Sequence, residues 1–278
     1  MLTPDVPRFF VRLQHAGWTP SQLLEICHAS ERLDYDGFSL YDVPSQPALE
    51  CWTALSYCLG STNRLVGVPL VLANPLRNPA LVAKAAADLQ TLSGGRLVLG
   101  LGAGGSDHDL RAYGLGDLPL RRRLEWLDEA LQLIRQLLTG RQHSHRGTRY
   151  AVEGLHVDLP PAPLPILVGG HGQRLLQIAA RHADIVNVGF DLTPEEWYRV
   201  KNLLERRRLE APQRETRLVL SHNISVPHAE DVDSLAVVHR LVRAGVSWFF
   251  LLFQDLPELT LLERFSKRVL LPFRTEGS

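Results

Sequence analysis

The residues best suited to chemistry in this chain lie in two glycine-rich stretches. One reads Gly-Leu-Gly-Ala-Gly-Gly-Ser from Gly100 to Ser106, and the other reads Gly-Gly-His-Gly from Gly169 to Gly172. Each follows a short apolar run, so each predicts a loop at the end of a buried strand. Glycine lets backbone N–H groups come close to a ligand, and successive N–H groups bind anions. The two stretches therefore favour a phosphate-bearing ligand, although glycines that only form tight turns explain them too.

The first stretch also fits the spacing G-x-G-x-x-G at Gly100, Gly102 and Gly105, which is typical of dinucleotide-binding loops. Such a loop belongs after a first strand, opens a long helix and precedes a strand that ends in an acidic residue. Here the loop follows a fourth predicted strand, and the acidic residues about 20 positions on fall inside a predicted helix. The context therefore excludes the dinucleotide-binding interpretation.

Other polar features could contribute to a site. His171 sits between two glycines and His222 ends a later apolar run, and each is a candidate for a site contact or for a structural histidine. The three arginines at 121–123 predict either a solvated charged face or a basic rim for a phosphate- or carboxylate-bearing cofactor tail. His143 and His145 have no carboxylate or cysteine that completes a ligand set, so we expect no metal.

These candidates must be positioned by alternating strands and helices. Apolar runs predict strands at residues 6–13, 37–42, 65–72, 96–99, 165–170, 184–188, 218–221 and 246–252. Helical spacing covers 20–33, 48–59, 80–92, 120–138, 173–182, 194–209, 234–244 and 258–270, and residues 140–161 predict a hairpin excursion. Alternation of this kind gives parallel strands, and eight of them favour a closed (β/α)8 barrel. We therefore expect an α/β protein with a single TIM-barrel domain over residues 1–278.

The composition limits the classes of partner. The chain has 278 residues, 45% of them hydrophobic, with 30 basic and 30 acidic side chains. This balance gives no field that favours nucleic acid or an anionic membrane. The N-terminus shows no signal peptide, and no apolar run approaches the roughly 18–20 residues of a membrane helix. Because Cys27, Cys51 and Cys58 lie in apolar contexts without paired spacing, we expect buried thiols and a cytoplasmic protein.

In a parallel barrel the active site forms at the carboxyl ends of the strands. The predicted ends carry Tyr41, Asp42 and Val43; Leu72, Ala73 and Asn74; 102–107; 169–172; Asn187 and Gly189; Ser221, His222 and Asn223; and Phe253 and Gln254.

The ordered motifs resemble those of the bacterial luciferase-like superfamily, whose members are (β/α)8 barrels that use FMN or the deazaflavin coenzyme F420. The resemblance rests on Leu-Ser-Gly-Gly-Arg-Leu-Val-Leu-Gly-Leu-Gly-Ala-Gly at 92–104, Asp-Gly-Phe-Ser-Leu-Tyr-Asp at 36–42, Asn-Pro-Leu-Arg-Asn-Pro-Ala-Leu-Val-Ala-Lys at 74–84 and Pro-Ile-Leu-Val-Gly-Gly-His-Gly at 165–172. It covers about residues 5–255.

The resemblance implies a flavin-type ring in the barrel mouth and a phosphate on the glycine stretches. The implied cofactor contacts are Asp42, Leu72, Ala73, Asn74, Gly102, Ala103, Gly104, Gly105, Ser106, Gly169, Gly170, His171 and Gly172. It also implies a non-proline cis peptide bond between Pro69 and Ala73. A homodimer through the second and third helices is implied as well. Trp52, Tyr57, Ala83, Ala86 and Ala87 could supply its surface, and packing in the protein's own core explains these residues equally well.

The short chain and the segment 72–84 look most like the F420-dependent branch. F420 is a hydride carrier, so this branch implies an oxidoreductase that transfers hydride between F420 and a small organic substrate. FMN would instead permit a two-component monooxygenase. A third possibility is a barrel that binds the cofactor without turnover.

Two positions depart from the family pattern. Many members have a histidine where this chain has Val43, and some F420 enzymes have a glutamate where it has Gly105. The usual general acid or base is therefore missing at both places. Asp42, His171 and His222 remain the candidate catalytic residues.

Overall fold

A computed structural model describes residues 7–190, 192–209, 218–226 and 234–276. Its main sheet follows the order β3-β2-β1-β11-β10-β9-β8-β5-β4, and the strands pair in parallel. These strands are β1 (Arg8–Leu13), β2 (Gly37–Leu40), β3 (Val66–Pro69), β4 (Leu72–Ala73), β5 (Leu99–Gly102), β8 (Ile166–Gly169), β9 (Ile185–Phe190), β10 (Val219–Val226) and β11 (Val246–Phe253). A parallel bridge from Gly67 of β3 to Leu97, two residues before β5, joins the two ends of this sheet. The sheet therefore closes into the predicted barrel.

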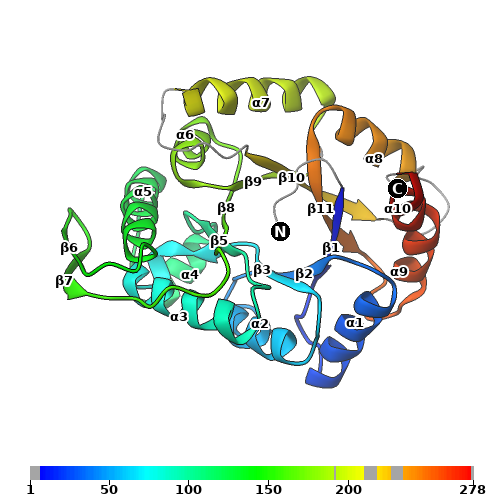
Figure 1. The fold of residues 1–278 in the computed structure, drawn as a ribbon, viewed down its shortest axis with the longest axis horizontal. Helices are drawn as coiled ribbons and strands as arrows, with labels where there is room; N and C mark the ends of the chain where they lie inside the picture. Colours follow the sequence, from blue (N-terminus) through cyan, green and yellow to red (C-terminus); the bar gives the residue numbers. More distant parts are fainter. Residues whose placement is uncertain (1–6, 191, 210–217, 227–233, 277–278) are drawn as a thin grey trace.

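Helices surround this barrel on the outside, as Figure 1 shows. They are α1 (Pro20–Arg32), α2 (Cys51–Gly60), α3 (Pro79–Leu92), α5 (Leu120–Leu137), α6 (Gln173–His182), α7 (Pro194–Leu209), α8 (Ser234–Arg243), α9 (Thr260–Phe265) and α10 (Leu271–Glu276). Two short elements, η1 (Asn74–Leu76) and α4 (Asp107–Ala112), lie in the loops after the third and fourth barrel strands. The predicted cap of the first helix is confirmed, since Thr19 accepts the Gln22 N–H and Pro20 is the first helical residue. None of the described helices combines the length and apolar character needed to cross a membrane.

The core has two parts. Inside the barrel, Phe10 stacks on Trp248 with ring centroids 4.7 Å apart and contacts Phe250. A larger apolar layer fills the space between the strands and the helices. The predicted buried thiols Cys27, Cys51 and Cys58 are unpaired and lie in this layer. The barrel is therefore a packed scaffold, and space for a ligand must come from its mouth.

Several predicted boundaries were wrong. The fourth strand was predicted to end at Leu99, but β5 runs on to Gly102, because small residues let the strand pass close to Pro69 and Val71. The third strand was predicted as one piece, but it is divided into β3 and β4. The Leu70–Val71 peptide bond between them is cis, as the resemblance implied. The last helix was predicted over 258–270, whereas helical residues extend from Thr260 to Glu276, including a π-helical turn (η2, Ser266–Leu270).

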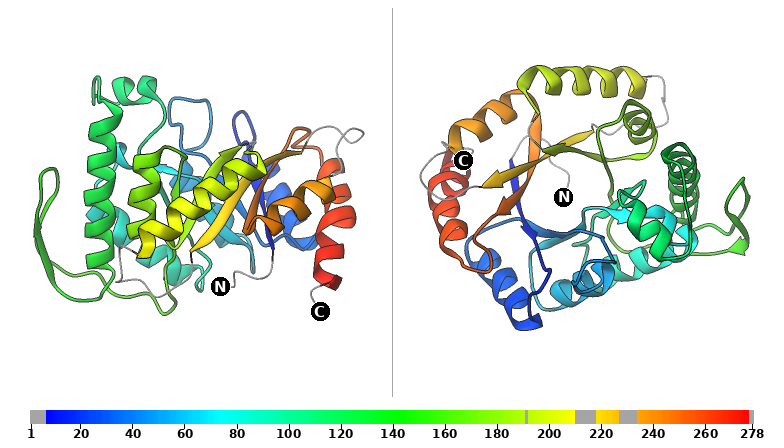
Figure 2. Two further views of the ribbon diagram at one scale, coloured as in Figure 1. Left: turned by 90° about the horizontal axis from the view of Figure 1, so that it is seen from above. Right: turned by 180° about the vertical axis from the view of Figure 1, so that it is seen from behind.

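The predicted hairpin excursion is confirmed. Strands β6 (His143–Arg146) and β7 (Ala151–Leu155) pair antiparallel and lie outside α5, away from the barrel (Figure 2). Glu129 of α5 attaches the hairpin, because its carboxylate accepts hydrogen bonds from the N–H groups of Arg149 and Tyr150 and from Thr148. The Tyr150 hydroxyl in turn accepts a hydrogen bond from Asn74 Nδ2 at 3.2 Å. The excursion thus contacts the loop after the third barrel strand.

This attachment predicts a pH dependence. Burial raises the pKa of Glu129, but hydrogen bonds from Thr148, Tyr150 and Arg149 outweigh it, so the pKa lies below its ordinary value. A lowered pKa in the folded state stabilises the hairpin above the unfolded pKa of about 4.3 and loses that stabilisation at lower pH. We expect the protection factors of the Arg149 and Tyr150 amides, which compare each exchange rate with that of the unfolded chain at the same pH, to fall as the pH drops below about 4. Glu129→Gln should already exchange faster at neutral pH, and an unchanged rate in this variant would contradict the assignment.

Candidate active site

A cavity of about 540 Å³ lies at the carboxyl ends of β2, β4, β5 and β8. This is the end of a parallel barrel at which active sites form. Its wall consists of Asp42, Val71, Ala73, Gly102, Ala103, Gly104, Gly105, Leu120, Leu124, Gly169, Gly170, His171, Gly172, Gln173, Arg174 and Leu175. The two glycine stretches, which are far apart in the sequence, thus face one cavity.

Three of the predicted cofactor contacts are not in this wall. Leu72 is buried in the layer between strands and helices. Asn74 is also buried and donates to Tyr150, and Ser106 caps α4 by accepting the Asp109 N–H. The other predicted contacts, Asp42, Ala73, Gly102, Ala103, Gly104, Gly105, Gly169, Gly170, His171 and Gly172, all line the cavity.

The glycines in the wall divide into three kinds, and two of them, Gly104 and Gly170, are explained by a positive φ. A β-carbon at Gly169 would lie 2.8 Å from Val71 Cγ1, and one at Gly102 would overlap Val71 Cγ2, so packing alone excludes side chains there. At Gly105 and Gly172 a β-carbon would meet nothing within 4 Å, and neither has a positive φ. Neither packing nor backbone conformation therefore requires glycine at Gly105 or Gly172. Their bare backbone fits a ligand that comes close to it.

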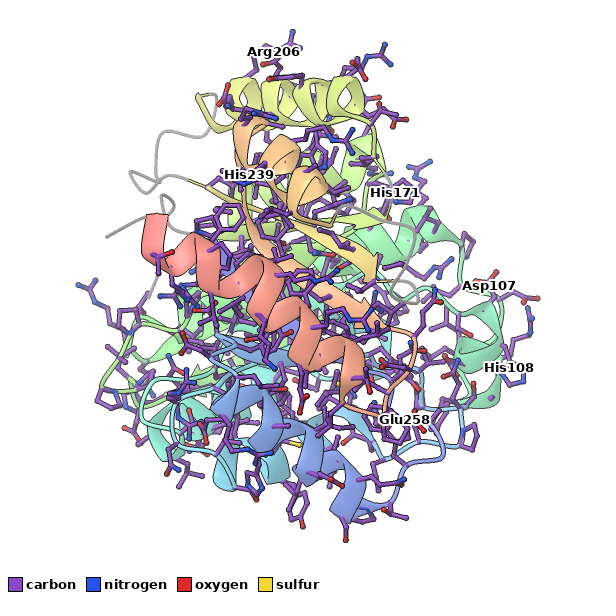
Figure 3. The ribbon with its side chains drawn as sticks, turned by 90° about the vertical axis from the view of Figure 1, so that its right-hand side faces the viewer. Asp107, His108, His171, Arg206, His239 and Glu258 are labelled. Carbon is purple, nitrogen blue, oxygen red and sulfur yellow. The ribbon has the colours of Figure 1, made fainter. Side chains whose placement is uncertain are left out.

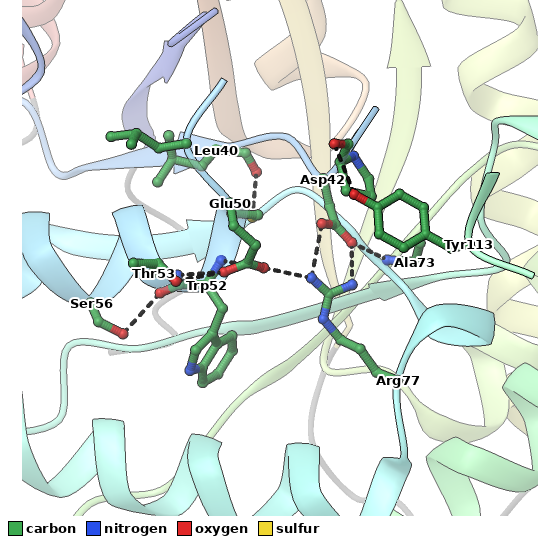
Figure 4. A network of polar contacts seen from close by, with 12 residues as sticks. Leu40, Asp42, Glu50, Trp52, Thr53, Ser56, Ala73, Arg77 and Tyr113 are labelled. Carbon is green, nitrogen blue, oxygen red and sulfur yellow. Dashed lines mark hydrogen bonds and ion pairs between the residues drawn. The ribbon is translucent and has the colours of Figure 1, made fainter. Parts of the chain in front are cut away.

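Asp42 belongs to a buried ion-pair network at the edge of the cavity (Figure 4). Its carboxylate accepts the Ala73 N–H at 2.7 Å and both guanidinium nitrogens of Arg77, at 2.5 and 2.9 Å. Arg77 Nη2 also lies 2.8 Å from Glu50, the residue that caps α2. The Asp42 side chain is only 1% exposed. This geometry makes Asp42 an acceptor that fixes Ala73 in the cavity wall, with no donor role left to it in this arrangement.

The two candidate histidines have different surroundings. His171 is exposed and lines the cavity, on the same side of the molecule as Asp107 and His108 (Figure 3). His222 is buried, with Nδ1 2.8 Å from the Val188 carbonyl oxygen and its ring edge-on to Trp197 of α7. It therefore faces away from the barrel interior, and the structure does not bring it to the cavity.

A buried polar cluster lies on the inner wall of β9 and β10. Asn187 Nδ2 donates to Ser221 Oγ at 3.1 Å and to Asn223 Oδ1 at 3.3 Å. These side chains lie two or four residues beyond Ile185 and Val219 of the barrel interior, and therefore on the same inward face of the strands. Asn187 also pairs with Gly169 of the cavity wall. The predicted strand ends thus supply a polar surface beside the cavity. Among the described residues, no group of three or more His, Cys, Asp or Glu side chains is placed to hold a metal.

The three arginines predicted as a charge run have separate contacts. Arg123 is buried and donates to the Gly104 carbonyl oxygen at 2.6 Å, which fixes the first glycine stretch, and it pairs with Asp107. Arg121 and Arg122 pair with Glu125, which also pairs with Arg174 of α6.

Sequence reasoning missed Arg174 and Arg77. Arg174 directly follows the second glycine stretch, which could have indicated it. Arg77 had no sequence signal beyond its place in the segment after the third strand.

Comparisons with known proteins agree with this fold. A family model described as luciferase-like monooxygenase matches residues 6–255. The chain belongs to this family. An uncharacterized protein of Mycobacterium tuberculosis is 36% identical over 60% of this chain and 56% of its own length. An F420-dependent glucose-6-phosphate dehydrogenase of Nakamurella multipartita is 29% identical over 66% of this chain and 56% of its own length. The chain thus spans about half the length of the curated relatives it matches.

Solved structures share the fold at low sequence identity. An F420-dependent secondary alcohol dehydrogenase in complex with an F420–acetone adduct gives a TM-score of 0.83 at 15% identity, over 96% of this chain and 99% of that one. A riboflavin lyase with modified FMN and riboflavin gives 0.82 at 14% identity, over 98% and 92%. At such identity the likeness establishes the barrel architecture alone.

The ion-pair network predicts an unequal cost of substitution. Arg77→Gln leaves the buried Asp42 carboxylate without its bidentate partner, so we expect the free energy of unfolding to fall by about 3 kcal/mol. Glu50→Gln is the matched control, because glutamine keeps an acceptor oxygen for the α2 cap. The Arg77–Glu50 pair that it removes has a half-exposed carboxylate, so we expect the free energy of unfolding to fall by less than about 1 kcal/mol. Urea unfolding at neutral pH measures both. Equal losses of unfolding free energy in the two variants would show that the buried Asp42–Arg77 pair stabilises the fold no more than the Arg77–Glu50 pair does.

Proposed function

We propose that this protein is an F420-dependent oxidoreductase that transfers hydride between the deazaflavin and a small organic substrate. The observation that carries the proposal is the open backbone at Gly105 and Gly172, two glycines of one cavity wall that neither packing nor φ explains. The F420-dependent relative that shares 29% identity over 66% of this chain supports the choice of F420 over FMN.

The proposed phosphate site lies between the two glycine stretches. Gly172 precedes α6 as its N-cap, and it has no side chain to cap the first turn. The N–H groups of that turn, together with the backbone at Gly105, can therefore bind a phosphate. Arg174, in the same turn and in the cavity wall, adds a guanidinium for this anion.

The proposed ring site lies over Val71 and Ala73. Val71 and Ala73 give this part of the cavity an apolar floor, and Asp42 holds the Ala73 backbone in place. When bound there, F420 supplies a carbon centre that accepts or donates hydride. The chain's own contribution is to orient the ring and to keep this part of the cavity apolar.

We assign the proton-transfer role to His171. Of the three predicted catalytic residues, Asp42 is engaged by three donors and His222 lies behind the barrel wall. His171 faces the cavity and is exposed, so it can hold a proton beside a substrate and exchange it with solvent.

The proposal includes assembly and location. We propose a homodimer through α2 and α3, supported by the exposed side chains of Tyr57 (46%) and Leu81 (69%). Of the two roles open to Ala83, Ala86 and Ala87, a dimer surface or core packing, the structure favours the second, because that face of α3 packs inward. The unpaired buried cysteines support a reducing compartment such as the cytoplasm.

Cofactor titration tests the assignment. We expect saturable binding of F420, followed by its fluorescence, and weaker binding of FMN. Gly105→Val and Gly172→Val should each lower F420 affinity about ten-fold or more, because charge-assisted hydrogen bonds contribute about 1.5–3 kcal/mol. Gly60→Val at the end of α2 is the matched control, since a β-carbon there also meets nothing within 4 Å. Gly104→Val is a poorer test because its φ of +79° strains any side chain.

The cofactor that binds decides between the proposed activities. Preferential binding of FMN would favour a monooxygenase instead, and failure of both F420 and FMN to bind would refute the proposed cofactor site.

The role of His171 has its own test. His171→Gln should lower the rate of F420 reduction with a panel of small alcohols by about 100-fold or more, the usual contribution of a general acid or base. Its affinity for F420 should stay close to that of the native protein. His108→Gln, at an exposed histidine of α4, is the control. An unchanged rate and pH profile in His171→Gln would exclude His171 as the proton donor or acceptor.

A further inference from the structure

Three exposed arginines gather where the cavity opens to solvent. Arg121 and Arg122 lie in the first turn of α5, and Arg174 lies in the first turn of α6. All three bond the same carboxylate, that of Glu125, at 3.1, 3.2 and 3.2 Å. Leu120, directly before Arg121, and Arg174 itself line the cavity. We call Arg121, Arg122 and Arg174 the arginine rim.

The arginine rim carries more positive charge than its contacts neutralise. Glu125 is the acidic partner of all three guanidiniums in the part of the chain that the structure describes. Its two carboxylate oxygens can accept only some of the N–H groups that three guanidiniums present. The nearby Arg123 does not share Glu125, because it pairs with Asp107 and the Gly104 carbonyl oxygen. Donors therefore remain for a further anion at the rim.

Helix stability does not account for this arrangement. Positive side chains in the first turn of a helix oppose its dipole, so Arg121 and Arg122 stand at an unfavourable end of α5. Arg181 of α6 shows the favourable case, since it lies in the last turn and pairs with Asp128 at 3.1 Å. The rim concentrates like charges at two helix starts, beside a cavity built for an anion. A bound polyanion would remove this repulsion.

We propose that the arginine rim binds a chain of carboxylate groups that continues from the cofactor phosphate out of the cavity. This inference rests on the proposed function, which places the phosphate between Gly105 and Gly172. FMN ends at its phosphate, whereas F420 continues beyond it into a chain of glutamate residues. The arginine rim thus distinguishes F420 from FMN by its glutamate tail. It also makes the affinity for F420 increase with the length of that tail.

Affinities for three probes test this inference. They are F420 with a long oligoglutamate chain, F420 with a short one, and the deazariboflavin 5′-phosphate that lacks the chain. Fluorescence titration should give the tightest binding for the long chain, with the difference between probes largest at low salt and reduced at high salt. The readout is binding alone and needs no substrate.

Variants locate the effect. Arg121→Gln and Arg122→Gln should each weaken binding of long-chain F420 by about two- to five-fold, and the double variant by on the order of ten-fold. The tail-less phosphate should lose little in Arg121→Gln and Arg122→Gln. Arg121→Lys should restore part of the lost affinity. Arg181→Gln, which removes an equally charged side chain from the far end of α6, should change nothing.

The outcomes separate this inference from the proposed function. Equal affinity for all three probes, or equal losses in the Arg121→Gln and Arg181→Gln variants, would overturn the tail site while leaving the F420 site intact. Failure of every deazaflavin probe to bind would instead refute the proposed function. We expect tighter binding of the long chain than of the tail-less phosphate, and we expect this difference to disappear in the Arg121→Gln, Arg122→Gln double variant.

Discussion

The side chain of Val71 occupies the space beside the mouth that Gly102 and Gly169 leave open. A side chain at either glycine would collide with it, so the third barrel strand can enter the mouth only because its neighbours there are bare backbone. This path of the third barrel strand places Val71 and Ala73 in the cavity wall, together with the two glycine stretches. The cavity therefore requires that the strands carrying Gly102 and Gly169 leave room for the Val71 side chain, although the three residues are far apart in the sequence. Within a packed interior, even one added methyl group at such a contact has to be accommodated by a shift of backbone.

Polar contacts hold the segment around Ala73 in place. Asp42 at the end of the second barrel strand binds the Ala73 backbone, and Arg77 connects Asp42 to the cap of α2. A carboxylate that accepts three hydrogen bonds while nearly inaccessible to solvent is suited to positioning and poorly suited to proton transfer. Under the proposed function, proton transfer therefore belongs to the exposed side of the cavity, where His171 lies. The departures at Val43 and Gly105 are consistent with this division, because neither position supplies a titratable group.

Helix α5 organises the outer part of the site. From its first turn to its middle it carries Arg121 and Arg122 of the rim, Arg123 on the glycine stretch, and Glu129 on the hairpin. Further along, Arg135 donates to Asp184 and the His182 carbonyl oxygen at the end of α6. One rigid helix therefore sets the relative positions of the first glycine stretch, the rim and the hairpin. Its apolar stripe packs in the core, and Leu120 and Leu124 near its start line the cavity.

The sequence by itself determined the barrel, because alternating apolar runs and helical stripes are local patterns that each element imposes on its own residues. It also determined the glycine stretches and the hairpin, which are short-range signals. Only the tertiary structure decided which glycines are needed for packing and which leave room for a ligand, since that depends on Val71, some 30 residues from Gly102 and about 100 from Gly169. It likewise decided that Asp42 is bound by Arg77, that His222 faces α7, and that Arg174 joins Arg121 and Arg122. Charge and steric contacts between distant segments leave no periodic trace in the chain, so these assignments required the folded barrel.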